Sequence, residues 1–146
     1  MEDKLAAWFE SHRHALIEGF MRAARDAQRF PGFSGLRVRQ LREFVRREVD
    51  GLISYMASDD DSLQEATKVH KDQNRRFLAD ISLAEQLEFL QARVEVVNQM
   101  FLSEPGTEPL HKEFDRKFEM ARRYYRTQSR AIDLEERFAR LGEEPQ

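Results

Sequence analysis

Residues 82–101 read SLAEQLEFLQARVEVVNQMF and form the stretch that decides the fold. Apolar residues recur in it at alternating intervals of four and three positions, which keeps them on one face of an α-helix. Ser82 and Glu85 form a capping box, in which the serine hydroxyl accepts a first-turn N–H and the carboxylate accepts the N–H of Ser82. Phe89 and Val96 widen the apolar surface, so we expect this helix to lie at the centre of the fold. The residues of the main apolar stripe are Leu83, Leu87, Leu90, Val94, Val97 and Phe101.

Three helical segments are predicted before this stretch, and the first two are rich in apolar residues. Residues 2–30 carry apolar residues at helical spacing, and Ser11 could cap a second helix after a short first one. The sequence FPGFSG (30–35) is punctuated by proline and glycine and predicts a loop. Ser34 can then cap a helix that extends to about Met56.

The outer face of that second segment is rich in arginine. Glu43 and Glu48 stand beside the arginines, so the pattern favours a solvated face with ion pairs between residues four apart. An alternative is a helical adaptor that binds a partner protein through this face. The arginines are Arg37, Arg39, Arg42, Arg46 and Arg47.

The predicted helix from Leu63 to about Ala79 has a polar middle on its inward face, where His70 lies. Either this helix packs loosely or it lines a small polar pocket. In an all-helical protein, an inward histidine can be a haem ligand, because imidazole is the usual proximal ligand. The alternative is a hydrogen-bonded, partly buried histidine, and the sequence leaves both interpretations open.

The last helix is predicted from Leu110 to about Leu141, which corresponds to roughly 45 Å. Its final part is charged and carries a thin apolar stripe, Leu134, Phe138 and Leu141. Such a stripe on a projecting helix is typical of a helix that pairs with a partner. We therefore expect a homodimer contact at these residues, since Phe138 and Leu141 would otherwise be exposed apolar groups.

Composition excludes several classes of protein. The net charge of −3 with interspersed signs argues against a nucleic-acid binder, and no apolar run approaches the ~18 residues of a membrane span. Cysteine is absent, which excludes disulfides and thiol chemistry. No zinc-protease, phosphate-loop or nucleophile-elbow motif occurs. We expect a non-enzymatic, cytoplasmic, all-α protein without a resident cofactor.

Three segments together carry a resemblance to a known family. They are WFESHRHALIEGFMRAA (8–24), LISYMASDDDSLQEA (52–66) and NRRFLADISLAEQLEFLQARVEVV (74–97). This pattern is similar to the N-terminal sensor domain of the RsbR proteins of bacterial stressosomes. Its sharpest part is the Ile81-Ser82-Leu83 turn into an apolar helix.

The resemblance implies a globin-like, single-domain helical bundle, usually without haem, that dimerises and projects from a large complex. In that family a C-terminal STAS domain assembles with RsbS and binds the kinase RsbT. By this comparison residues 1–133 form the sensor domain, and residues 134–146 begin the linker to a STAS-like domain that this chain lacks. Haem-binding relatives place a histidine close to the turn before the next helix, where this chain has Leu78 instead. The expected function is stress sensing and signal transduction; the alternative is a haem or small-ligand binding globin with His70 as the ligand.

Overall fold

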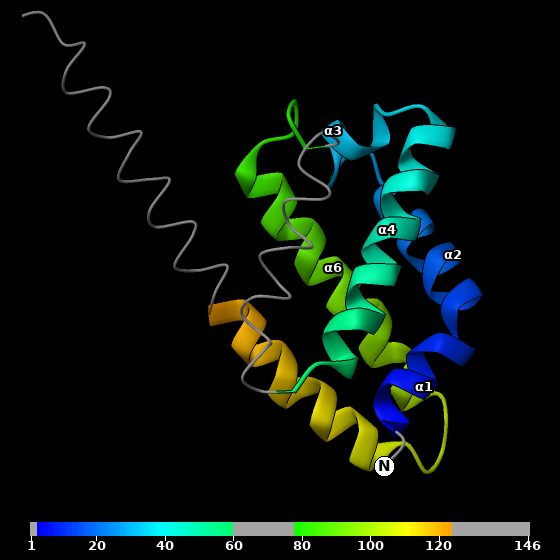
Figure 1. Cartoon of the computed structure of the whole chain (residues 1–146). Helices are drawn as coiled ribbons and strands as arrows, with labels where there is room; N and C mark the ends of the chain where they lie inside the picture. The colour runs from blue at the N-terminus through cyan, green and yellow to red at the C-terminus, as the bar shows by residue number, and fades with distance from the viewer. Residues whose placement is uncertain (1–2, 60–77, 124–146) are drawn as a thin grey trace, which may run out of the picture.

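The computed structural model describes residues 3–59 and 78–123, and within these ranges every regular element is a helix. The elements are α1 (Lys4–Ser11), α2 (Arg13–Ala24), α3 (Pro31–Ser34), α4 (Val38–Ala57) and α6 (Leu83–Leu102), followed by a helix over residues 108–123. Figure 1 shows α2, α4 and α6 side by side, with helix 108–123 crossing the end of the bundle near α1. The predicted all-α helical bundle is confirmed for the described residues.

The break predicted in the first helical segment is present, but its chemistry differs. The chain kinks at His12, which is both the C-cap of α1 and the N-cap of α2. Ser11 does not cap α2, because its hydroxyl donates to the carbonyl of Trp8 (3.0 Å). The helix also ends at Ala24 rather than at Phe30. Asp26 then caps a turn by accepting from the backbone N–H groups of residues 28 and 29.

The segment predicted as a loop contains the short helix α3, with Pro31 in its first turn. Proline suits that position, because its missing N–H would have no partner there. The Glu85 carboxylate of α6 accepts from the N–H groups of Gly32 (2.9 Å) and Phe33 (2.7 Å). This carboxylate was predicted to bond the N–H of Ser82, and that half of the capping box is wrong. The Ser82 half is confirmed, since its hydroxyl accepts from the N–H of Glu85 (3.2 Å).

Helix α4 has the apolar inner face that its sequence predicts. Leu41, Phe44, Val45, Val49 and Met56 are all buried. The predicted cap is wrong, because the N-cap residue is Arg37 and not Ser34. The intervening residues form α3 and a turn, so the helix begins later than a serine cap would place it.

Helix α6 carries part of its predicted stripe into the core. Val94, Val97 and Phe101 are buried, whereas Leu83, Leu87 and Leu90 are only partly buried. Phe89, which lies beside the stripe, is fully buried against a cluster of phenylalanines from α3, α4 and the segment before α3. The face of α6 that points into the core is therefore rotated away from the predicted leucine stripe, because the large side chain of Phe89 occupies the core instead.

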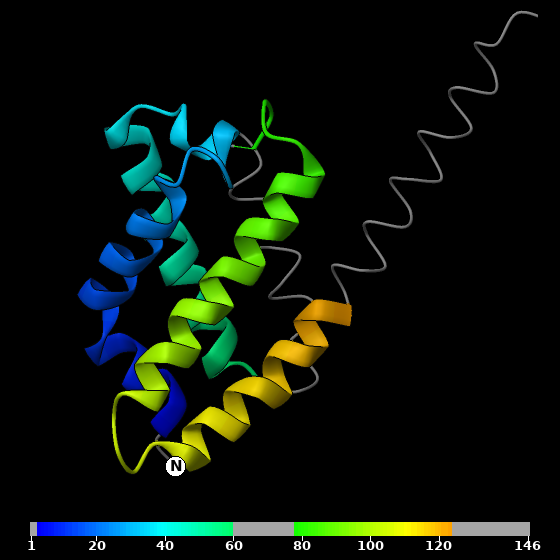
Figure 2. The ribbon, with the colours of Figure 1, turned by 180° about the vertical axis from the view of Figure 1, so that it is seen from behind.

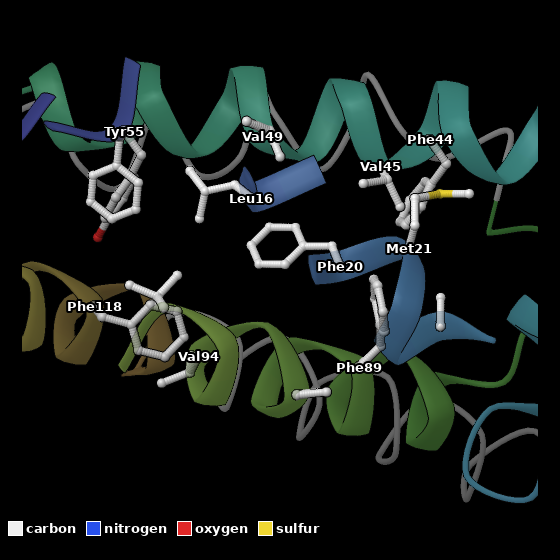
Figure 3. Close-up of a cluster of buried hydrophobic side chains, with 14 of the residues drawn as sticks. Leu16, Phe20, Met21, Phe44, Val45, Val49, Tyr55, Phe89, Val94 and Phe118 are labelled. Carbon is white, nitrogen blue, oxygen red and sulfur yellow. The ribbon is translucent and has the colours of Figure 1, made fainter. Parts of the chain in front are cut away.

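Aromatic and aliphatic side chains from α2, α4 and α6 fill the interior (Figure 3). Phe20 and Met21 of α2 lie between the side chains of α4 and α6, and both are almost fully buried. A Cβ added to Gly19 would come within 2.8 Å of Val96 Cγ1. Glycine at this position therefore lets α2 approach α6 closely.

Candidate functional site

The sequence-predicted site residues lie outside the described residues. These are His70, the candidate haem ligand, and the dimer and linker residues Leu134, Phe138 and Leu141. Most of the polar helix that was expected between Leu63 and Ala79 also lies outside them, as does the last helix beyond residue 123. Their roles remain predictions.

The arginine-rich face of α4 is largely paired within the chain. Arg42 donates to Glu18 of α2 (3.0 Å), and Arg46 and Arg47 both donate to Glu43. These hydrogen bonds hold the pKa of Glu18 and of Glu43 below the ordinary carboxyl value. The solvated face with internal ion pairs is thus what the structure shows for these three arginines, and the pairing leaves less charge for an adaptor interface.

An ion pair joins the inner faces of α4 and α6. Glu48, only 6% exposed, accepts a hydrogen bond from the Arg93 guanidinium, whose carbon also lies 5.1 Å from the centre of the Phe89 ring. The Nε atom of Arg93 is buried and has no hydrogen-bond partner within the described part of the chain. Burying a charge is costly unless it is paired. The relative position of α4 and α6 therefore determines whether this pair stays intact.

A column of stacked rings lies at the C-terminal end of α6. His12 stacks on Trp8 (4.2 Å between ring centres), Trp8 on Phe101 (4.1 Å), and Phe101 on His111 (5.0 Å). Glu104 anchors the column, because it accepts from Trp8 Nε1 (2.9 Å) and lies 3.1 Å from His12 Nε2. Sequence reasoning missed this arrangement. The four rings come from three separate segments, so no local spacing reveals them.

The most unusual polar group in the described residues is Lys117, which is 6% exposed. Its ammonium donates to the carbonyls of Met56 (2.5 Å) and Ser58 (3.1 Å) at the C-terminal end of α4. In return, the hydroxyl of Tyr55 donates to the carbonyl of Lys117 (2.8 Å). The lysine therefore supplies the hydrogen bonds and the positive charge that favour a helix C-terminus. We call this reciprocal contact the α4 clasp, defined by Tyr55, Met56, Ser58 and Lys117.

Two further features fix the α4 clasp in place. Phe114, about one turn before the lysine, packs beside Phe9 and Phe101. Phe118, the residue after the lysine, packs against Phe114. Asp3 Oδ2 lies 3.9 Å from the Lys117 ammonium. The sequence did carry a signal, because a lysine between Phe114 and Phe118 lies on the apolar face of its own helix. The predicted buried side of this helix does not include Lys117, because lysine is usually a surface residue.

Within the described ranges, no group of three histidine, aspartate or glutamate side chains is arranged to hold a metal ion. In the same ranges no helix has the length and apolarity that crossing a membrane requires. Comparisons of the chain with protein-family models, with curated proteins and with solved structures find no match.

Proposed function

We propose that this chain is a dimeric, non-enzymatic sensing domain of a stressosome-type regulator, which relays a signal through its terminal helix to an attached output domain. The stressosome part of the proposal is supported by the sequence resemblance. The relay is supported by the structure of the α4 clasp. The proposal places no cofactor in the domain, and its partners are a second copy of the chain and, through an attached STAS domain, RsbS and RsbT.

The observation that carries the relay is the burial of the Lys117 charge between two helices. A lysine side chain that leaves its carbonyl partners while remaining buried loses far more than an exposed one, because water does not replace the lost bonds. Helix 108–123 therefore has to follow the C-terminal end of α4 whenever α4 moves. This rigid attachment is what a relay helix requires, since a loosely packed helix would absorb the displacement.

The input end of the relay lies on the same helix. Glu48 and Met56 are eight positions apart on α4, which corresponds to about 12 Å along the axis. A signal that disturbs the Glu48–Arg93 pair would shift α4 against α6, and the α4 clasp would carry that shift to helix 108–123. A ligand or partner acts on such an element only by binding its two positions with different affinity.

Distance measurements between spin labels test this relay directly. The chain has no cysteine, so Arg39→Cys on α4 and Met120→Cys on helix 108–123 give two unique labelling positions. Dilution with unlabelled chain removes distances between copies. The disturbance at the input end is Glu48→Gln, which weakens the ion pair and keeps the shape of the side chain.

We expect Glu48→Gln to shift or broaden the distance distribution when Lys117 is present. In the Lys117→Met background the distribution should already be broad, and Glu48→Gln should change it little. A distribution that is unaffected by both substitutions would refute the relay. Light scattering tests the dimer independently, and a monomer at all concentrations up to about 100 μM would refute that part of the proposal.

A further inference from the structure

An open groove of about 660 Å³ runs between α2 and α6. Figure 2 shows these two helices side by side on the face of the bundle turned toward the viewer. The apolar residues that line the groove include Ala15, Ala23 and Met100, and charged residues line it as well. On the α2 side of the groove, a row of charged side chains indicates which molecule could bind there.

Charges alternate along the exposed edge of α2. His14, Glu18, Arg22 and Asp26 follow one another at intervals of four residues, and all four line the groove. Residues four apart lie on one face of a helix, so Glu18 and Arg22 form neighbouring acidic and basic positions. Asp26 stands one further step along, just past the end of the helix. We call these four residues the α2 charge row.

The α2 charge row is complementary to itself. In an antiparallel pair of identical helices related by a two-fold axis, the same edge of each helix meets the same edge of the other. If the axis passes level with Phe20, Glu18 faces Arg22 of the second copy and Arg22 faces its Glu18. In the same register His14 faces Asp26. Each of the contacts then joins an acidic residue to a basic or titratable one.

The charges of the row are accessible for such pairing. His14, Arg22 and Asp26 are exposed, and the Glu18 side chain is 41% exposed although it accepts a hydrogen bond from Arg42. The remaining charges of the groove are held elsewhere. Arg29 donates to Glu88 and Glu95, which raises the pKa of Arg29 above its ordinary value.

We propose that a second copy of this chain docks on the α2–α6 groove, with the two α2 helices antiparallel and Glu18 of each copy paired with Arg22 of the other. This inference rests on the proposed dimer and assigns its contact face. It places the contact on α2, in place of the Leu134, Phe138 and Leu141 positions predicted from the sequence.

Opposite charge reversals in two separate chains test the pairing. Arg22→Glu alone makes both facing pairs acidic, and Glu18→Arg alone makes both basic. Like charges facing each other across an interface are strongly unfavourable, so each variant alone should dimerise about tenfold more weakly or worse than the unmodified chain. Mixed in equal amounts, the two variants restore both opposite-charge pairs, and heterodimers should form within about threefold of the original affinity.

Native mass spectrometry distinguishes these species, since the two variants differ in mass. Arg39→Glu on α4 is the matched control, because it makes the same charge change at an exposed position outside the groove. Circular dichroism tests whether each variant is folded. If Glu18→Arg is unfolded, the salt dependence of the Arg22→Glu homodimer supplies the test instead. Added salt should then strengthen that homodimer, because it screens the repulsion between the facing acidic residues.

Three results would overturn the inference. If both single variants dimerise like the control, the face is wrong while the proposed dimer stands. If Phe138→Ser dissolves the dimer and the charge reversals do not, the contact lies on the terminal helix as the sequence predicted. If the unmodified chain is monomeric, the dimer of the proposed function fails together with this inference.

Discussion

Replacement of Lys117 by methionine removes the charge from the α4 clasp and keeps most of the volume of the side chain. Lys117 donates to the carbonyls of Met56 and Ser58, and hydrogen bonds from a charged group contribute about 1.5 to 3 kcal/mol each. Burying methionine does not carry the dehydration cost of burying an ammonium group, and this difference offsets part of the lost hydrogen-bond free energy. We therefore expect a net loss of roughly 2 to 3 kcal/mol in the free energy of unfolding.

Urea denaturation followed by tryptophan fluorescence measures this loss. The chain contains one tryptophan, and Trp8 is 7% exposed and stacked on Phe101, so unfolding exposes it to water. Lys112→Met is the matched control on the same helix, because Lys112 is exposed and surface substitutions usually change stability by no more than about 0.5 kcal/mol. At roughly 3 °C per kcal/mol, the expected loss corresponds to a fall in Tm of about 6 to 9 °C.

The result that would refute the reasoning is a Lys117→Met chain as stable as the Lys112→Met chain. The buried lysine would then contribute nothing net, as some buried charges do. A loss much larger than the expected range would instead indicate that the lysine holds more of the fold than the end of α4.

Three further predictions concern the core, pH and haem. Phe89→Ala should lower the free energy of unfolding by about 3 to 5 kcal/mol in the same denaturation assay, because Phe89 is fully buried in a phenylalanine cluster; a loss under about 1 kcal/mol would contradict the packing. Hydrogen bonds from Arg46 and Arg47 lower the pKa of Glu43 from its ordinary value of 4.5, so their contribution is complete above that value and is lost as pH falls through the lowered pKa. Replacing both arginines by methionine should flatten the decline of stability below about pH 4.5, and an unchanged decline would contradict this assignment. Haem reconstitution should give no Soret band, whereas a band abolished by His70→Ala would establish the haem alternative.

Much of the helical framework could be predicted from apolar spacing and local caps. The apolar face of α4 and the Ser82 cap of α6 both follow from residues close together in the sequence. The break near Ser11 was predicted in the right place but from the wrong cap, because Ser11 bonds the carbonyl of Trp8. Interactions within one or two turns depend on local geometry, which sequence spacing expresses directly.

The errors share a physical cause, which is competition from distant partners. Glu85 does not form the local capping box, because its carboxylate accepts two hydrogen bonds from N–H groups of α3 instead. Phe89 rather than the leucine stripe turns inward because three other phenylalanine rings surround it. The partners of Glu85 and Phe89 lie between 45 and 59 residues away in the sequence, so periodicity within one helix could not reveal the preference.

The candidate sites divide in the same way. The ion pairs between Glu43 and its neighbouring arginines were predictable from spacing, whereas the Glu48–Arg93 pair and the α4 clasp depend on how helices pack. Lys117 was detectable only as a charged residue on an apolar face. A charged residue at a predicted inward position is therefore a better sequence signal of a specific contact between helices than another apolar residue is.

A double-mutant cycle between Glu48→Gln and Lys117→Met tests the central claim, that the ion pair and the α4 clasp act as one mechanical unit. The free energy of unfolding is measured for the parent chain, both single variants and the double variant. Lys117 contacts α4 at Met56, about 12 Å along the helix axis from Glu48. If the two sites are independent, their effects should add to within about 0.5 kcal/mol. The relay predicts a coupling free energy of about 1 kcal/mol or more, and strict additivity would contradict it.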